Sequence, residues 1–225
     1  MLAKVAGRSQ VIFPGGDGRL YAFDPSKGCL LWKLDCNPPN STRWTIKARG
    51  TRLFFVGTPV VEKEMLYVGL NSDSEAAPAA PLLAIDLREA TKATKKAIKW
   101  RFHTREFPYG TYSSPVISDA VVYTVSDHPM RLFAIDSGTG KELWRSHEME
   151  YGNAEMFGSP IASGRNLYVP EFTSIRVFRR GRKKHYLGRI QFEKKVFGTP
   201  RIAGDMMYVT CRNKLFALRL PRELR

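Results

Sequence analysis

The sequence contains only three cysteines, Cys29, Cys36 and Cys211, and no two of them are adjacent or separated by two residues. This excludes a C-x-x-C zinc ligand pair and the C-x-x-C-H attachment site of a c-type haem. The four histidines are scattered, and none stands at ligand spacing from a cysteine or another histidine. The sequence therefore offers no recognisable metal or haem site.

Long apolar runs and enzyme motifs are also missing. No stretch approaches the roughly 18 apolar residues of a membrane span, and residues 1–13 lack the apolar core of a signal peptide. As written, the chain is expected in the cytoplasm, or outside it if a signal segment precedes Met1. Because no G-x-S-x-G elbow, Walker loop or H-E-x-x-H stretch occurs, hydrolytic or nucleotide chemistry has no anchor and the sequence favours a protein that is not an enzyme.

Acidic residues are in short supply. The chain has 21 Asp and Glu against 36 Lys and Arg, which gives a net charge of +15. This balance favours acidic partners such as nucleic acid, anionic lipid or a polyanionic polymer. With 43% hydrophobic residues and charges spread along the chain, the protein is expected to fold.

What the sequence has is internal repetition. A hydroxyl residue followed by proline recurs at Thr58, Ser114, Ser159 and Thr199, and a short apolar run follows each time. Two further β-forming runs and a run that often ends in tryptophan complete each repeat, which predicts four short strands per repeat. The repeats cover about residues 9–36, 57–102, 113–146, 158–193 and 198–220. The fold class is all-β, and residues 88–99 form an insert that would tolerate a helical turn.

Two repeats carry an ungapped A-x-D-x-x-x-G-x-x-x-W motif, and a third keeps its tryptophan. The expected roles are structural: Ala permits close packing, Asp accepts bonds from turn amides, Gly supplies a positive φ, and Trp covers the next repeat. The residues are Ala22, Asp24, Gly28 and Trp32, then Trp100, then Ala134, Asp136, Gly140 and Trp144.

This motif resembles the tryptophan-docking repeat of the quinoprotein-like family, over about residues 10–220. The resemblance implies a single β-propeller domain over residues 1–225, built of four-stranded antiparallel blades. The family includes dehydrogenases that bind pyrroloquinoline quinone with calcium, and also non-enzymatic relatives such as the outer-membrane assembly lipoprotein and uncharacterised bacterial proteins. The adjacent cysteines of the dehydrogenases are absent here and their carboxylate set cannot be mapped, so the cofactor is only an alternative.

The repeats are incomplete at both ends and in the fourth copy. The first repeat shows its second to fourth strands and the fifth its first to third, while residues 2–6 offer an edge strand. A closed ring, missing blades and self-association through open edges all stay open. In the fourth repeat the run that begins at Ser174 lacks the motif and no tryptophan follows, so its docking contact should be weaker.

In a propeller, the loops that join the second to the third strand lie on the same face as those leading to the next blade. The loops between the second and third strands here predict a partner-binding face, and its candidate residues are Asp17, Asn71, Asp73, Glu75, Asp127, His128, Glu171 and Arg212.

The opposite face should be basic, with Lys95, Lys96, Arg179, Arg180, Arg182, Lys183 and Lys184. Only one aromatic, Tyr186, adjoins this run, which disfavours nucleic acid. Calcium at Asn71, Asp73 and Glu75 is disfavoured too, because the required glycine and bidentate glutamate are missing.

Three functions follow. The sequence favours a non-enzymatic binding or scaffold propeller for a protein or polymer partner. One alternative is a relative or fragment of a quinoprotein oxidoreductase that binds pyrroloquinoline quinone or another small ligand near the axis. The other is polyanion binding through the basic face.

Overall fold

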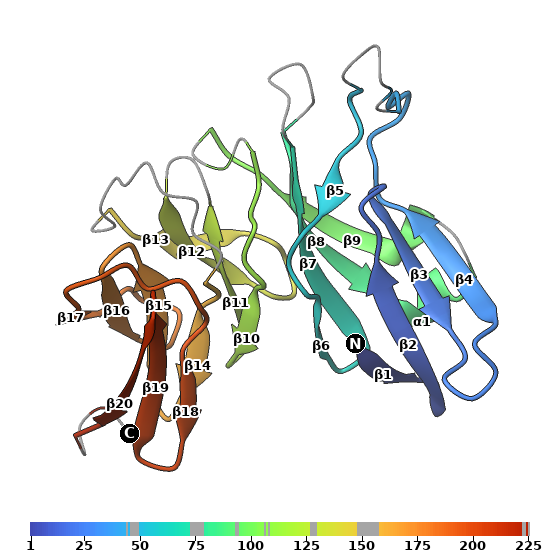
Figure 1. Cartoon of the computed structure of the whole chain (residues 1–225). Helices are drawn as coiled ribbons and strands as arrows, with labels where there is room; N and C mark the ends of the chain where they lie inside the picture. The colour runs from blue at the N-terminus through green and yellow to red at the C-terminus, as the bar shows by residue number, and fades with distance from the viewer. Residues whose placement is uncertain are drawn as a thin grey trace. The chain divides into compact units, whose positions relative to one another are not determined.

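The computed structural model is built almost wholly of short antiparallel strands (Figure 1). It divides into two compact units, Met1–Ser114 and Pro115–Arg225, which are described separately. None of its described helices is long and apolar enough to cross a membrane. The structure describes residues 1–43, 45, 50–72, 79–92, 95–105, 107, 109–126, 130–147, 158–221 and 224.

The first unit contains two sheets, here called blades 1 and 2. Blade 1 has the strand order β1 (Leu2–Val5), β2 (Arg8–Pro14), β3 (Arg19–Phe23) and β4 (Leu30–Asp35). β1 is the edge strand that the sequence offered at residues 2–6, and it adds a strand before the predicted repeat 9–36 because it pairs with β2 in the same sheet, with Leu2 opposite Val11. Alternate burial of Ala3 and Val5 holds this first strand against the core.

Blade 2 contains the insert between its third and fourth strands. Its first strand is in two pieces, which both pair with the second strand. The expected helical turn is confirmed, since the Asp86 carboxylate caps a short helix by accepting from the amides of Arg88 and Glu89. The elements are β5 (Phe54–Phe55), β6 (Val60–Glu62), β7 (Met65–Asn71), β8 (Leu82–Asp86), α1 (Leu87–Ala90), η1 (Lys95–Ala97) and β9 (Ile98–Phe102).

The second unit contains blades 3 to 5. Blade 3 comprises β10 (Val116–Ser118), β11 (Val121–Ser126), β12 (Arg131–Asp136) and β13 (Glu142–Arg145). Blade 4 comprises β14 (Ile161–Ser163), β15 (Asn166–Glu171), β16 (Ser174–Arg179) and β17 (Tyr186–Gln191). Blade 5 has only β18 (Arg201–Ala203), β19 (Met206–Cys211) and β20 (Lys214–Arg219). The all-β class, the antiparallel blades and the three-stranded fifth repeat are confirmed.

The A-x-D-x-x-x-G-x-x-x-W motif builds the turn between the third and fourth strands. One oxygen of Asp24 accepts from the amides of Ser26 and Lys27 at 2.9 and 3.0 Å, and the Gly28 amide donates to the Asp24 carbonyl at 2.8 Å. Gly28 has a φ of +67°, which favours glycine. Asp136 and Gly140 repeat this geometry in blade 3. The motif's predicted turn chemistry is therefore confirmed.

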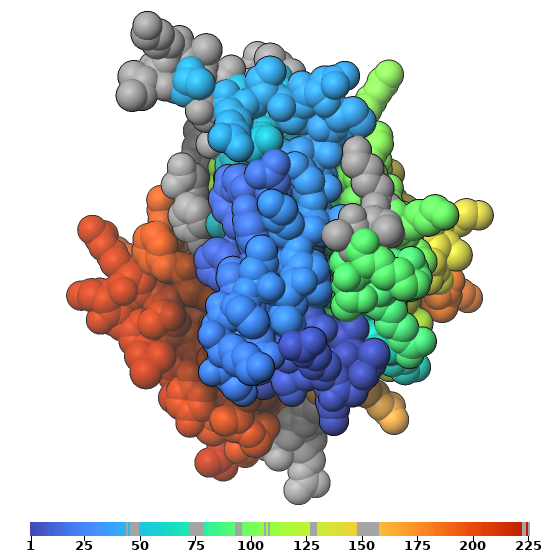
Figure 2. Space-filling view, turned by 90° about the vertical axis from the view of Figure 1, so that its right-hand side faces the viewer, coloured from blue at the N-terminus to red at the C-terminus, as the bar shows by residue number. Residues whose placement is uncertain are grey.

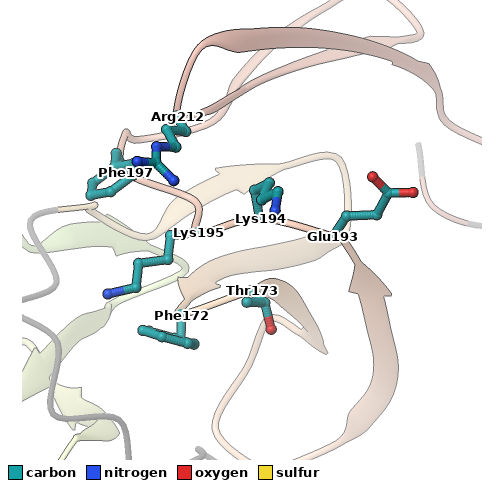
Figure 3. Close-up of a pocket in the computed structure, with 7 residues that line it drawn as sticks. All are labelled: Phe172, Thr173, Glu193, Lys194, Lys195, Phe197 and Arg212. Atoms are coloured by element: carbon teal, nitrogen blue, oxygen red, sulfur yellow. The ribbon is translucent and has the colours of Figure 1, made fainter.

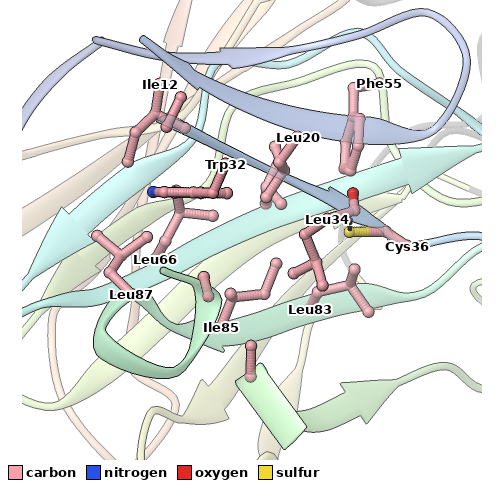
Figure 4. Close-up of a cluster of buried hydrophobic side chains, with 14 of the residues drawn as sticks. Ile12, Leu20, Trp32, Leu34, Cys36, Phe55, Leu66, Leu83, Ile85 and Leu87 are labelled. Atoms are coloured by element: carbon pink, nitrogen blue, oxygen red, sulfur yellow. Dashed lines mark hydrogen bonds between the residues drawn. The ribbon is translucent and has the colours of Figure 1, made fainter. Parts of the chain in front are cut away.

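Trp32 of blade 1 packs onto blade 2, as predicted. Its ring is almost fully buried in one cluster with Leu66 and Leu87 (Figure 4). The indole Nε1 donates to Oε1 of Gln10 at 2.7 Å, which satisfies its one polar atom. Figure 2 shows the surface of the β4 region (blue) beside that of the blade 2 insert (green), whose helix contacts β4.

Trp144 joins blades 3 and 4 in the same way. Its Nε1 donates to the carbonyl of Gly181 at 3.0 Å, and its ring centroid lies 5.9 Å from that of Phe178. The Gly181 amide in turn donates to the Tyr123 hydroxyl at 2.7 Å. The tip of the blade 4 hairpin is thereby fixed to blade 3.

Blade 4 itself lacks a docking tryptophan. Ala22, Ala84 and Ala134 stand opposite Trp32, Trp100 and Trp144, whereas Val177 stands opposite Gly188. No atom lies within 4 Å of the place where a Cβ of Gly188 would be. This open position agrees with the expected weaker docking contact of the fourth repeat.

Candidate functional site

A pocket of about 450 Å³ opens where loops of blades 4 and 5 meet (Figure 3). Its walls come from three segments that are far apart in the sequence. Phe172 and Thr173 form the turn between β15 and β16, residues 193–197 lead from blade 4 to blade 5, and Arg212 lies in the turn after β19. The lining residues are Phe172, Thr173, Glu193, Lys194, Lys195, Phe197 and Arg212.

Backbone hydrogen bonds join these three segments. The Val196 amide donates to the Phe172 carbonyl at 2.8 Å, and the Phe197 amide donates to the Thr210 carbonyl at 3.3 Å. The connecting loop is therefore attached to both strand turns. As predicted for a propeller, the loops of these two kinds lie on one face of this unit.

The pocket combines aromatic surface with positive charge. The lining contains three cations, Lys194, Lys195 and Arg212, and a single carboxylate, that of Glu193. The Lys195 ammonium lies 4.6 Å from the centroid of the Phe172 ring, and the Phe197 side chain is 53% exposed. Cation–π contact holds Lys195 over Phe172 without neutralising its charge. A ligand with an acidic group and an apolar side chain fits this chemistry.

Beneath the pocket lies a buried ion pair. Glu171 is fully buried, and one of its oxygens accepts from Nε of Arg176 at 2.7 Å and from the Ser174 hydroxyl at 2.9 Å. Arg176 also donates to the Tyr186 hydroxyl at 3.2 Å. Glu171 was predicted on a partner-binding face, but the arginine on the next strand draws its carboxylate inward. It holds the turn that carries Phe172 rather than facing solvent.

The structure describes three of the other predicted loop residues. Arg212 lines the pocket. Asp17 is half-buried and accepts from the Tyr21 hydroxyl at 2.8 Å. Asn71 is buried at the end of β7. The remaining four, Asp73, Glu75, Asp127 and His128, lie outside the described residues.

A smaller polar hollow of about 230 Å³ lies near Asp17 in the first unit, and its lining includes Asp35, Asn37 and Arg52. Burial tends to raise the pKa of Asp35, but hydrogen bonds from Asn37 and Arg19 outweigh it and lower that pKa. The Asn37 amide also accepts from the Leu53 backbone at 2.9 Å. Asp35 therefore binds the side chains of Asn37 and Arg19, and these three residues form a structural network.

The predicted basic face is partly structural. Arg180 donates to the Ser118 hydroxyl and pairs with Asp119 at 3.6 Å, while Arg182 pairs with Asp136 at 2.6 Å. These contacts join blade 4 to blade 3. Arg179 is half-buried, and the side chain of Lys95 lies outside the described part. The exposed members are Arg182, which is paired, and Lys96, Lys183 and Lys184.

The Asp136–Arg182 pair predicts a measurable titration. The Arg182 guanidinium, together with Thr139, lowers the pKa of Asp136 from 3.8 to about 2. Because folding lowers this pKa, the pair stabilises the fold above pH 3.8, and that contribution is lost as the pH falls towards 2. In Arg182→Gln the pKa should return towards 3.8, as followed by carbon NMR of the carboxyl group. A pKa that moves equally in Lys183→Gln would refute the assignment.

The described residues do not fit the calcium ion of a quinone cofactor site. In the described part of the chain, no group of three or more His, Cys, Asp or Glu side chains could hold a metal ion. The three cysteines are separate: Cys29 is exposed, and Cys36 and Cys211 are buried. Burial raises the pKa of the Cys36 thiol to about 12, which makes it inert. We therefore assign no redox role to these residues.

Most of the pocket residues are not among those predicted from the sequence. Glu193 ends the predicted fourth repeat, and Lys194 and Lys195 follow it in the connecting loop. A signal was present: Phe192 and Phe197 flank a run of three charged residues just before the Thr199-Pro200 that opens the next repeat. Phe172 and Phe197 lie 25 positions apart (197 − 172), so only the fold brings them together.

Comparison with solved structures shows the fold. BamB from Moraxella catarrhalis superposes with a TM-score of 0.69 at 16% identity over 96% of this chain and 56% of that one. The computationally designed Ika8 protein matches with a TM-score of 0.56 at 12% identity, over 97% of this chain and 70% of that one. The quinohemoprotein alcohol dehydrogenase ADHIIG from Pseudomonas putida HK5 gives 0.59 at 15% identity, over 84% and 34%.

These likenesses are too distant in sequence to show more than a propeller of quinoprotein type. The chain spans only 56% of the Moraxella protein. Among curated proteins, the sequence finds no match. The family model described as outer membrane protein assembly factor BamB matches residues 16–184, which is more than half of the 225 residues. The chain therefore belongs to that BamB family.

Proposed function

We propose that this chain is a non-enzymatic propeller that binds a protein partner through the pocket between the loops of blades 4 and 5. One observation carries the proposal: three cations and two aromatic rings converge on a single hollow, from segments that backbone hydrogen bonds hold together. Loops on a rigid scaffold are the usual place for binding residues.

The family supports a protein as the partner. Its description names an outer membrane protein assembly factor, and the Moraxella BamB shares the fold. We extend this type of role, binding to another protein, to the present chain. The identity of the partner is specified here only by its chemistry.

That chemistry is an acidic segment with an aromatic or aliphatic side chain. Ion pairs between exposed groups contribute about 0.2–1 kcal/mol each, so Lys194, Lys195 and Arg212 alone would hold a partner weakly. Burial of one large apolar side chain against Phe172 and Phe197 adds about 1.5–3 kcal/mol. The three cations together and the aromatic walls therefore contribute comparable amounts to the affinity, and the cations in addition select an acidic partner and speed association.

Charge reversal measures how much the three cations contribute to partner binding. The triple variant Lys194→Glu, Lys195→Glu and Arg212→Glu should weaken partner binding at least tenfold, as measured by affinity purification from source cells followed by quantitative mass spectrometry. The matched control reverses three exposed cations that do not line the pocket, Lys96, Lys183 and Lys184. It changes the net charge by the same amount and should retain the partner.

The control also separates the proposal from polyanion binding. If the basic face carried the function, reversal of Lys96, Lys183 and Lys184 would abolish binding and the pocket variant would keep it. That outcome would overturn the pocket as the binding site. Polyanion binding has less support, because Arg180 and Arg182 are already paired with acidic residues of blade 3.

A further inference from the structure

The polar hollow of the first unit occupies the same place in the repeat as the pocket of blades 4 and 5. It lies in the connection from the fourth strand of blade 1, which ends at Asp35, to the first strand of blade 2, which begins at Phe54. The Asn37 side-chain amide attaches this connection to the turn between β2 and β3 by donating to the Asp17 carbonyl at 2.9 Å. Loops held by a rigid scaffold are the usual place for binding residues.

Several polar groups of this hollow already have partners within the protein. The Asp35 carboxylate accepts from Nε of Arg19 at 3.0 Å and from the Asn37 side chain at 2.8 Å. The Ser41 hydroxyl donates to the Pro38 carbonyl at 2.7 Å. Arg19 does not line the hollow, so the charge of Asp35 is neutralised from outside it.

Arg52 is a cation of the lining whose charge is not neutralised by any described carboxylate. It belongs to no ion pair in the part of the chain that the structure describes, and its Nε is buried without a hydrogen-bond partner. A buried donor without an acceptor is costly and uncommon in native proteins. A ligand with an acceptor atom would satisfy this donor. Asn40 lines the same hollow, is exposed, and offers a side-chain amide to such a ligand.

The backbone on both sides of Arg52 is fixed. The Thr42 amide donates to Oγ1 of Thr51 at 3.0 Å, and the Thr51 amide donates to Oγ1 of Thr42 at 3.1 Å. The Arg52 amide itself donates to the Thr42 carbonyl at 3.2 Å. On the other side, the amide of the fully buried Leu53 donates to Oδ1 of Asn37 at 2.9 Å. Arg52 is therefore carried by a preorganised backbone, which lowers the entropic cost of binding a ligand.

The charge and the size of the hollow select its ligand. The planar guanidinium fork of Arg52 matches the two oxygens of one carboxylate. A phosphate dianion would place two negative charges against this one cation, in a lining that also contains the Asp35 carboxylate. The volume of about 230 Å³ is smaller than the roughly 300–1,000 Å³ of sites for drug-sized ligands. Pro38 and Pro39 add a rigid wall. The ligand is therefore a small group with a single carboxylate.

We propose that this hollow is a second binding site, which accepts one carboxylate through paired hydrogen bonds from Nε and a terminal nitrogen of Arg52, with the Asn40 amide as a further donor. A glutamate side chain and the C-terminal carboxylate of a peptide both offer this chemistry, and the experiment distinguishes the two sources. The site shares no residue with the pocket of blades 4 and 5 and does not depend on the function proposed for that pocket.

Proton–nitrogen NMR of the full chain, with isotope-labelled arginine, tests the proposal. The Nε–H proton signal of Arg52 should move downfield on titration with N-acetylalanine, which has a terminal carboxylate, or with N-acetylglutamic acid N-methylamide, which has a side-chain carboxylate. The compound that saturates the shift at the lower concentration identifies the source. Arg52→Lys keeps the charge and removes the fork, so the affinity should fall about tenfold, the effect of one hydrogen bond to a charged group. The Leu53 backbone amide signal reports binding in this variant.

Arg43→Lys is the matched control, because Arg43 is exposed in the same connection and does not line the hollow. It should bind both carboxylates as the wild type does, and so should the chain with the charge-reversed pocket of blades 4 and 5. An Arg52 signal that moves with neither carboxylate would overturn the proposal. An equal shift with the neutral N-acetylalanine N-methylamide or with inorganic phosphate would overturn it too, and these wild-type titrations decide even if Arg52→Lys does not fold. Equal losses of affinity in Arg43→Lys and Arg52→Lys would likewise contradict it.

Discussion

Replacement of Trp144 by alanine is expected to lower the free energy of unfolding of the second unit by about 3–5 kcal/mol, the range found for buried aromatic residues. Trp144 is 8% exposed and packs in one cluster with Tyr123 and Phe178. The change leaves a cavity between blades 3 and 4 and removes the hydrogen bond to the Gly181 carbonyl. Chemical denaturation, followed by circular dichroism, measures the loss.

The variant Trp144→Phe separates the cost of the cavity from the cost of the lost hydrogen bond. It keeps an aromatic ring in the cavity and removes the indole donor, so most of its cost should come from one lost hydrogen bond, about 0.5–1.5 kcal/mol. The Gly181 carbonyl keeps the Tyr123 hydroxyl as a donor at 3.4 Å. If Trp144→Ala and Trp144→Phe were both close to wild type, Trp144 would not be holding the two blades together.

Removal of either member of the Glu171–Arg176 pair should cost about 3–5 kcal/mol, because the remaining charge would be buried without its partner. Glu171 is fully buried and the Arg176 side chain is 7% exposed. Thermal and chemical denaturation of Glu171→Ala and Arg176→Ala measure this effect. Partner binding at the pocket should weaken as well, since the pair supports the turn that carries Phe172.

The double variant Glu171→Leu with Arg176→Met is the control. Replacement of a whole buried ion pair by apolar residues of similar volume is often neutral or stabilising. The double variant should therefore be more stable than either single alanine variant. If it is the least stable of the three, the loss comes from packing and not from an unpaired charge.

The repeat architecture could be predicted because each repeat is marked by short sequence motifs whose contacts are local. The Asp24 and Asp136 turns need only residues close in the sequence, and the tryptophans that follow them have one large buried face each. The strand β1, Leu2–Val5, lies within residues 2–6, which the sequence offered as an edge strand, and its pairing with β2 assigns it to blade 1.

The binding residues were harder to predict, since they depend on contacts between distant segments. Glu171 stands in a turn, where an acidic residue is normally solvated, and only the Arg176 guanidinium on the next strand explains its burial. Arg182 appeared to belong to a solvated basic run, yet it pairs with Asp136, 46 positions away. Lys195 was overlooked because its aromatic partner, Phe172, precedes it by a whole strand pair.

The most direct test of the pocket is site-specific photo-crosslinking in the source cells. A photoreactive amino acid at Thr173, in the pocket wall, should give one dominant covalent adduct with an acidic protein, identified by mass spectrometry. The same residue at Leu30, an exposed apolar position in blade 1, should not give this adduct. An adduct that forms equally at both positions, or only at Leu30, would contradict the assignment of the pocket as the partner-binding site.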